Sequence, residues 1–239
     1  MNLSGKSAIV TGVSSGLGKE LANALVRKGC KVYGLARNGH NLSKIKFQLG
    51  KLFIPVVLDI TDFKKVENWI HSEFSSSNSP DILINNAGVG RFGKIDEMPF
   101  EDWLTMVNTN LNGMYFLTAQ VVPFLKQKET STSILNIGSI LGTVGRAEGS
   151  AYSATKFGVQ GFSDSLFKEL REFNIKVSCI HPGSIDTNFF QSSGIKSHPY
   201  MLNPQEVSDT IIHVLETPDN LLISELTIRP LHPKPPMGK

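Results

Sequence analysis

The sequence of 239 residues has few cysteines, little net charge and no long apolar stretch, and each shortage excludes a class of protein. Two cysteines, Cys30 and Cys179, cannot form a disulfide framework or a cysteine-rich zinc site, so we expect both to be small buried apolar residues. The 24 Lys and Arg exceed the 21 Asp and Glu by only 3, which is too slight an excess to indicate nucleic acid or an anionic membrane as a partner.

No apolar run approaches the roughly 18 residues of a membrane span. The first ten residues include Gly5 and Lys6 and do not read as a signal peptide. We therefore expect a cytoplasmic protein with no membrane partner and with reduced thiols. The 40% of hydrophobic residues is enough for one sizeable core. The length favours a single domain over residues 1–239, with little room for a separate substrate domain.

Short runs rich in Val, Ile and Leu alternate with amphipathic helical stretches along the chain. The runs barely alternate in polarity, which is typical of parallel strands buried on both faces. We expect strands at residues 7–11, 31–36, 53–59, 82–85, 134–137, 176–180 and 222–228. Helical spacing is clear in the stretches that contain Leu17, Val66 and Val159, and Gly29 stands where the first helix should end. The alternation predicts an α/β fold with a doubly wound parallel sheet.

Residues 188–203 form the one long stretch that breaks this alternation. It holds Gly194, Pro199 and scattered aromatic residues, among them Phe190 and Tyr200. A long irregular segment in a compact domain is often a functional lid, and we expect this one to cover the substrate. His198 within it is expected to be a surface residue and not a metal ligand, because the histidines show no ligand spacing.

A glycine-rich turn joins the first predicted strand to the first predicted helix, and it reads Thr11-Gly12-Val13-Ser14-Ser15-Gly16-Leu17-Gly18. Glycines let the backbone turn tightly and approach a pyrophosphate, whose charge is favourable at a helix N-terminus. The strand, the turn and the helix occur in the right order at the start of the chain, which predicts a dinucleotide site.

The end of the second predicted strand indicates which dinucleotide binds. Sites for NAD have an acidic residue about 20 positions after the glycines, whereas a nearby Arg accommodates the 2′-phosphate of NADP. Ala36 occupies the acidic position here and Arg37 follows it. A guanidinium pairs with a phosphate that a carboxylate would repel, so the sequence favours NADP(H).

Over nearly its whole length, the sequence resembles the short-chain dehydrogenase/reductase family. The resemblance rests on motifs that occur in the family's order: the turn at 11–18, Asp59-Ile60, Asn85-Asn86-Ala87-Gly88, Asn110-Leu111-Asn112-Gly113, Ser139, Tyr152-Ser153-Ala154-Thr155-Lys156, and Pro182-Gly183 with Thr187. It implies a Rossmann-like fold and hydride transfer between NADP(H) and a small-molecule carbonyl or secondary alcohol. It also implies a homodimer or homotetramer formed through the helical stretches at 100–126 and 150–171.

The resemblance also assigns catalytic roles to four residues. Tyr152 is the expected general acid or base, and Lys156 should tune it and hold the nicotinamide ribose. The two lie four residues apart on one helix face, and a neighbouring ammonium should lower the pKa of the phenol from its ordinary value near 10. Ser139 is expected to donate a hydrogen bond to the substrate oxygen. Asn110 is expected to hold a water that links Lys156 to solvent.

Cofactor contacts are expected along the same motifs. Asp59 and Ile60 should meet the adenine, Asn86 to Gly88 should shape the ribose and nicotinamide side, and the stretch from Pro182 to Thr187 should receive the carboxamide. The full set of expected cofactor residues is Gly12, Ser14, Ser15, Gly16, Leu17, Gly18, Arg37, Asp59, Ile60, Asn86, Ala87, Gly88, Tyr152, Lys156, Pro182, Gly183, Ile185 and Thr187.

The substrate stays open at this point. Arg91, Phe92 and Arg146 follow motifs that border the expected cleft, and either Arg could pair with an anionic substrate or simply be solvated. The end of the chain at 224–230 looks more like that of 3-hydroxy acid dehydrogenase-like and sepiapterin reductase-like members than like that of 3-oxoacyl-carrier-protein reductases. A reductase of the latter kind and a non-catalytic NADP(H) sensor are the alternatives.

Overall fold

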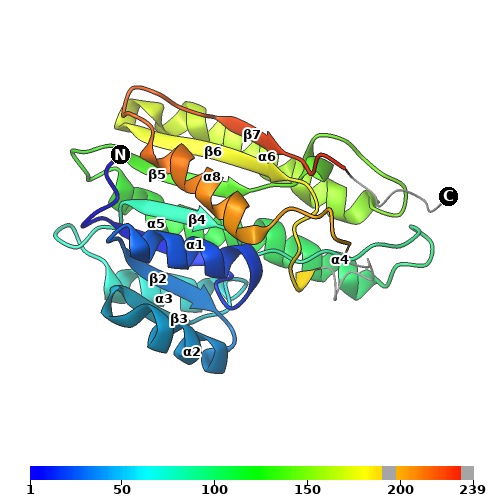
Figure 1. Ribbon diagram of the computed structural model, residues 1–239, viewed down its shortest axis with the longest axis horizontal. Helices are drawn as coiled ribbons and strands as arrows, with labels where there is room; N and C mark the ends of the chain where they lie inside the picture. The colour runs from blue at the N-terminus through cyan, green and yellow to red at the C-terminus, as the bar shows by residue number, and fades with distance from the viewer. Residues whose placement is uncertain (190–197, 233–239) are drawn as a thin grey trace.

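A computed structural model describes residues 1–189 and 198–232 of the chain. It contains one parallel sheet of seven strands in the order β3-β2-β1-β4-β5-β6-β7, with helices on both faces (Figure 1). The strands are β1 (Ser7–Thr11), β2 (Lys31–Ala36), β3 (Phe53–Val57), β4 (Ile82–Asn85), β5 (Thr132–Ile137), β6 (Ile175–Pro182) and β7 (Glu225–Ile228). The predicted doubly wound, Rossmann-like single domain is confirmed.

All seven predicted strands exist; β1, β2 and β4 have the predicted bounds, and the ends of the other four differ by one to three residues. The strand β3 stops at Val57, two residues before the predicted end, because the chain turns there toward Asp59. The strand β6 is longer than predicted and includes His181 and Pro182, which are buried like the rest of the strand. The last strand, β7, begins only at Glu225 and alternates between exposed and half-buried residues, as suits a strand at the edge of the sheet.

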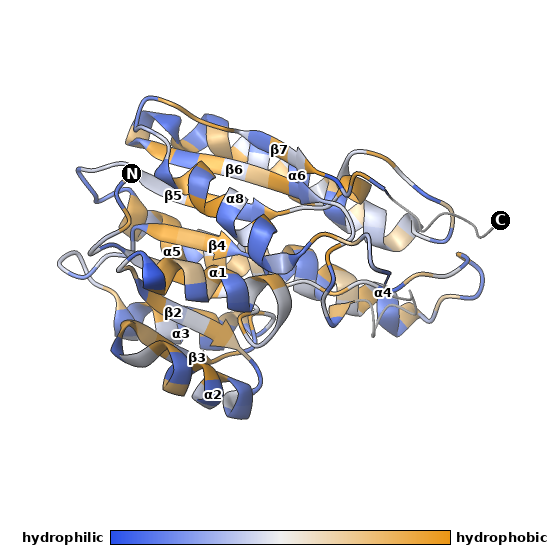
Figure 2. Cartoon of the chain, viewed as in Figure 1, coloured by the Kyte–Doolittle hydropathy of each residue, from blue (hydrophilic) through white to orange (hydrophobic). Residues whose placement is uncertain are grey.

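Two apolar layers hold the helices on the sheet. The helices are α1 (Gly16–Arg27), α2 (Gly39–Leu49), α3 (Phe63–Glu73), α4 (Phe100–Val107), α5 (Met114–Leu125), α6 (Ser150–Leu170) and α8 (Pro204–Glu216). Buried residues of α1, α2 and α8 form one cluster with the sheet, and those of α3, α5 and α6 form a second cluster with the sheet. The strands between the layers are mostly apolar, whereas the helices mix apolar with polar residues (Figure 2).

The expected single helix over 100–126 is interrupted. A π-helical segment, η2 (Asn108–Gly113), separates α4 from α5. Gly113 lies against Ile60, and a Cβ atom at this position would come within 2.8 Å of the Ile60 side chain. The extra residue of a π-turn changes which side chains face inward, and such turns are frequent at functional sites. Asn110 is buried within this segment.

Local features of the sequence explain the first crossover from β1 to β2. Leu17, Leu21 and Leu25 share the buried face of α1, and Gly29 adopts φ 80° just after the helix. That conformation favours glycine and ends the helix as predicted. Cys30 and Cys179 are both buried free thiols, also as predicted.

Candidate active site

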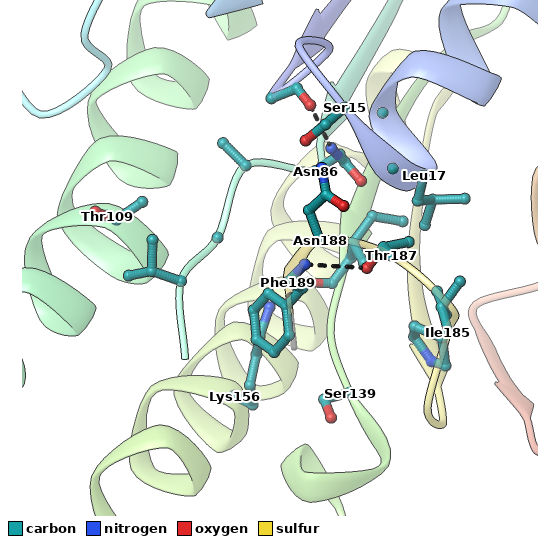
Figure 3. Close-up of a pocket in the computed structure, with 18 of the residues that line it drawn as sticks. Ser15, Leu17, Asn86, Thr109, Ser139, Lys156, Ile185, Thr187, Asn188 and Phe189 are labelled. Carbon is teal, nitrogen blue, oxygen red and sulfur yellow. Dashed lines mark hydrogen bonds between the residues drawn. The ribbon is translucent and has the colours of Figure 1, made fainter. Parts of the chain in front are cut away.

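A cavity of about 680 Å³ opens at the carboxyl ends of the strands. Residues that follow six different strands line it, in the place where open α/β sheets bind their ligands. All 18 residues that the sequence analysis assigns to the cofactor are among the lining residues. Figure 3 shows the arrangement, with Ser15 before α1 and Leu17 in its first turn at one end, and Ser139 and Lys156 at the other.

The glycine-rich turn packs closely against the segment that follows β4. Gly12 and Gly16 have φ values of 72° and 55°, which favour glycine. A Cβ atom on Gly12 would lie 2.9 Å from the Ala87 Cα atom, and one on Gly18 would lie 2.4 Å from the Gly12 carbonyl oxygen. Larger residues would therefore disrupt this turn.

The N-terminus of α1 lacks a cap of its own. Ser15 precedes the helix, but its side chain accepts no hydrogen bond from the first turn, and that turn holds no acidic residue. Asn38, Asp62 and Asn203 do accept such bonds at the starts of α2, α3 and α8, whereas α4 and α6 begin without one, as α1 does. The N–H groups at the start of α1 thus face the cavity without a side-chain acceptor of this kind, which fits a phosphate group.

Thr11 and Asn86 join the ends of β1 and β4. The Thr11 hydroxyl oxygen lies 2.9 Å from the backbone nitrogens of both Asn86 and Ala87 and accepts hydrogen bonds from them. The Asn86 side chain donates back to the Thr11 carbonyl oxygen at 2.8 Å. These bonds fix the spacing of the two loops that the cavity separates. Neither Thr11 nor the Asn86 amide was assigned this joining role from the sequence.

Asp59 and Arg37 lie on the wall next to the glycine turn, together with Ala36. The Asp59 Oδ1 atom accepts hydrogen bonds from the backbone nitrogen and the hydroxyl of Thr61, at 2.9 and 2.8 Å. This carboxylate therefore also shapes its own turn. Arg37 is exposed at the cavity rim.

Tyr152 is buried near the opposite end, between two aromatic rings. The rings of Phe92 and Phe189 lie 5.3 and 5.9 Å from its centroid. Burial raises the pKa of Tyr152 to about 12, and a hydrogen bond with Ser139 offsets part of that rise. The expected lowering by Lys156 is not found in this structure, because desolvation of the phenol dominates its pKa.

Lys156 is buried one helical turn from Tyr152. Its Nζ atom donates to the Ile137 carbonyl oxygen at 2.8 Å and lies 5.8 Å from the Tyr152 ring centroid. Burial lowers its pKa to about 8, since a charged amine is costly to remove from water. An ammonium has three donors, so two remain for a ligand.

Ser139 precedes a short turn after β5 and is mostly buried. Its hydroxyl oxygen accepts a hydrogen bond from the Leu141 nitrogen at 3.1 Å, which leaves the hydroxyl proton for another partner. Its backbone carbonyl faces the fully buried ring of His181, with 2.9 Å between the oxygen and Nδ1. The other ring nitrogen of His181 lies 2.7 Å from Oε1 of Gln160. Sequence reasoning missed His181; its place directly before Pro182 was the available signal.

Asn110 lies behind the main cavity and does not line it. Its Oδ1 atom accepts from the Val89 nitrogen at 2.8 Å, and its amide donates to the Val89 oxygen and to Thr155 at 2.9 and 3.0 Å. It thereby joins the loop after β4 to α6. A second cavity, of about 10 Å³, is lined by Asn110, Lys156 and Asn85 among others. Its volume is on the order of that needed for one water molecule.

The predicted lid falls partly outside the described residues, which exclude 190–197 and hence Phe190. Its described ends adjoin the cavity, where Asn188, Phe189, His198 and Met201 are lining residues. His198, expected at the surface, is half-buried and lines the cavity. Hydrogen bonds of Leu202 to Ser184 and Asp186 fix the far end of the segment.

Comparison with known proteins identifies the family. A sequence model of the family described as short chain dehydrogenase matches residues 6–197. The chain belongs to this family. The protein is therefore an oxidoreductase. Except for the motif at Asn110, the motifs that indicated this family in the sequence contribute residues to the cavity described above.

Individual relatives cover most of the chain. An uncharacterised oxidoreductase of Staphylococcus epidermidis is 30% identical over 226 residues, 95% of this chain and 97% of that protein. A 3-oxoacyl-(acyl-carrier-protein) reductase of Vibrio harveyi is 35% identical over 188 residues, 79% of this chain and 77% of that protein. Among solved structures, the closed form of a serine dehydrogenase complexed with NADP+ has a TM-score of 0.85 and 28% identity, over 93% of this chain and 94% of that one.

Among residues 1–189 and 198–232, no helix is both long and apolar enough to cross a membrane. Within the same residues, no three His, Cys, Asp or Glu side chains gather as metal ligands would.

The lowered pKa of Lys156 predicts how stability changes with pH. Below pH 8 the amine is charged in both the folded and the unfolded chain, so folding bears the full cost of burying the charge. Between about pH 8 and pH 10 the folded protein loses this proton and the unfolded chain keeps it, so stability rises with pH. The expected slope from this one group approaches about 1.4 kcal/mol per pH unit.

Chemical denaturation of the wild type and of Lys156→Met, measured from pH 7 to pH 10, checks this prediction. The variant serves as the control because other titrating groups are common to both proteins, including the two cysteines whose pKa values burial raises. The stability of the wild type relative to the variant should increase across this range. A difference that stays constant, or that decreases, would contradict a depressed pKa for Lys156.

Proposed function

We propose that the protein is an NADP(H)-dependent oxidoreductase that interconverts a carbonyl and a secondary alcohol, with Tyr152 as general acid or base. The proposal rests on one observation: two sets of residues line the same cavity. The uncapped helix start and its glycine turn lie at one end, and Tyr152, Ser139 and Lys156 lie at the other. The relative complexed with NADP+ supports the cofactor class.

Different walls of the cavity suit different parts of NADP(H). The N–H groups at the start of α1 are suited to the pyrophosphate, and Arg37 is suited to the 2′-phosphate. Asp59, Ile60 and the segment from Asn86 to Gly88 would form the adenosine wall, and Pro182, Gly183, Ile185 and Thr187 the carboxamide wall. When bound, the nicotinamide supplies or accepts the hydride.

The protein's own residues would handle the proton. In the direction of reduction, the substrate oxygen accepts hydrogen bonds from the Tyr152 and Ser139 hydroxyls. With its pKa raised to about 12, Tyr152 carries its proton at neutral pH and is ready to donate it as negative charge develops on the oxygen. Ser139 stabilises the same charge as a preorganised donor.

Lys156 and Asn110 would complete the proton path. The ammonium of Lys156 has donors left for a ribose hydroxyl after its bond to the Ile137 carbonyl. A positive charge beside the deprotonated phenol would stabilise it after transfer. A water in the small cavity that Lys156 and Asn110 share would link the lysine to further proton donors.

Two substrate classes are open within this proposal. The curated relative named as a 3-oxoacyl-(acyl-carrier-protein) reductase favours a thioester-linked ketone. The solved structure named as a serine dehydrogenase favours a small hydroxy acid. The residues around Tyr152 are relevant to the choice, because Phe92 and Phe189 give the cavity an apolar wall there.

We also propose that copies of the chain associate through α4, α5 and α6. These helices expose large apolar side chains, with Phe100 67% and Tyr115 57% exposed, and Phe157 47% exposed. Large exposed apolar side chains are typical of a protein interface where they gather in one patch. Light scattering of the purified protein should give the mass of a dimer or tetramer, and Tyr115→Lys together with Phe157→Lys should lower it. A monomeric wild type at micromolar concentration would contradict the proposal.

Replacement of Tyr152 by Phe distinguishes the enzyme from a sensor. Loss of the acidic hydroxyl should reduce turnover of NADPH with carbonyl substrates by about 10²-fold or more, while NADPH binding persists. Turnover is measured as the loss of NADPH absorbance with a panel of ketones. NADPH binding is measured as the change in fluorescence when NADPH is added to the protein. NADPH binding without turnover of any carbonyl by the wild type would favour the sensor.

Replacement of Arg37 by Asp tests the cofactor preference. A carboxylate at the rim would repel the 2′-phosphate and accept hydrogen bonds from the ribose of NAD, so the ratio of kcat/KM for NADPH to that for NADH should fall and reverse. Arg27→Asp makes the same charge change on the outer surface of α1 and is the matched control. An unchanged ratio in Arg37→Asp would show that Arg37 does not contact the phosphate.

A further inference from the structure

Four charged side chains line the described part of the cavity, two toward each end. Arg37 and Asp59 lie by the glycine turn, and Arg146 and Lys156 lie by Tyr152. Lys156 is buried and donates to a backbone carbonyl. Arg146 is exposed at the mouth, where a ligand from solvent reaches it.

The Arg146 guanidinium lies over an aromatic ring that itself packs on Tyr152. Its central carbon is 5.1 Å from the Phe92 ring centroid, and the Phe92 ring is 5.3 Å from that of Tyr152. Stacking on a ring holds a guanidinium in place while its edge stays available to hydrogen-bond acceptors. Arg146 is thus placed two ring contacts from the hydroxyl that would bind the substrate oxygen.

A backbone hydrogen bond and a strained residue hold the loops of Phe92 and Arg146 together. The Gly93 nitrogen donates to the Glu148 carbonyl oxygen at 2.8 Å and thereby joins the loop of Phe92 to the loop of Arg146. Glu148 has φ 59°, a left-handed conformation that costs a non-glycine residue on the order of 1 kcal/mol. The next residue must be small, because a Cβ atom on Gly149 would lie 2.7 Å from Cγ of Arg146.

Arg146 also differs from the other cations near this mouth. Arg91 pairs with Asp102, with 3.5 Å between nitrogen and oxygen, and Lys94 pairs with Glu97 at 2.9 Å. Within residues 1–189 and 198–232, no carboxylate lies within ion-pair distance of Arg146, and its Nε donates to the Ala147 carbonyl. Of the two arginines that the sequence leaves open, the structure favours Arg146 as the anion-binding residue.

We infer that the substrate of the proposed reaction carries a carboxylate, and that the Arg146 guanidinium binds it while Tyr152 binds the carbonyl oxygen. A guanidinium offers paired donors that match the two oxygens of a carboxylate. The carbons between the two groups would lie along Phe92 and Phe189, which supply apolar contact. This inference rests on the proposed function and narrows it to oxo acids and hydroxy acids.

Steady-state kinetics with paired substrates test the inference. Oxo acids of graded chain length are each compared with their methyl esters, with NADPH saturating, in the wild type, Arg146→Met and Arg146→Lys. The wild type should prefer an acid over its ester. In Arg146→Met this preference should fall about 10- to 100-fold, mainly through KM of the acid, as befits loss of a hydrogen-bonded charge. Arg146→Lys should retain part of it, since an ammonium keeps the charge but not the paired geometry.

The matched control is Arg91→Met, which removes the same charge from the neighbouring loop at a residue that does not line the cavity. It should leave the preference for the acid unchanged. An equal loss of kcat/KM with acids and with esters in Arg146→Met would show a structural role and overturn the inference. A wild type that prefers esters or 3-oxoacyl thioesters would also overturn it. A rise in KM for NADPH alone would assign Arg146 to the dinucleotide and would also overturn it.

Failure of the proposed function has a different signature. In that case the wild type binds NADPH but oxidises it with neither acids, esters nor thioesters, whatever residue stands at 146. Turnover of neutral carbonyls with no effect of Arg146→Met overturns only the carboxylate inference and leaves the reductase in place.

Discussion

The junction between β1 and β4 is the constraint on which the site depends. It is the point in the strand order where the chain's path along the sheet reverses, so the loops that follow the two strands diverge and leave a crevice. The Thr11 hydroxyl, which accepts from the Asn86 and Ala87 nitrogens, holds the crevice to a fixed width. Both the glycine turn and the wall at Asn86 to Gly88 take their positions from this pair of bonds.

Burial sets the chemistry at the other end of the crevice. Tyr152 and Lys156 are both removed from water, and desolvation moves their pKa values in opposite senses, to about 12 and about 8. The phenol keeps its proton at neutral pH and the amine holds its own less firmly, as the proposed transfer of a proton from Tyr152 requires. The polar contacts of Lys156 and Asn110 with backbone carbonyls and with Thr155 satisfy these groups inside the core.

The sequence was sufficient for the sheet and for the cavity walls because both depend on local pattern. Buried parallel strands are continuous apolar runs, and the glycine turn must follow the first of them, so those elements and the residues after each strand could be predicted in order. Helix α2 was not predicted, since only Leu42 and Ile45 of its residues are buried and Phe47 is almost fully exposed. Its apolar pattern is therefore weak, and packing on the sheet decides its conformation.

Other features arise only from contacts between distant segments. Gly113 of the π-helical segment packs against Ile60, which is distant in sequence. Tyr152 lies beside the rings of Phe92 and Phe189, and its burial raises its pKa. The same holds for the choice between Arg91 and Arg146, which look alike in the sequence. A backbone bond from Gly93 to Glu148 joins the loops of Phe92 and Arg146, whose guanidinium lies over the Phe92 ring, whereas Arg91 pairs with Asp102. Charge alone therefore does not identify a ligand-binding arginine; the partner that each guanidinium already has determines what it can still bind.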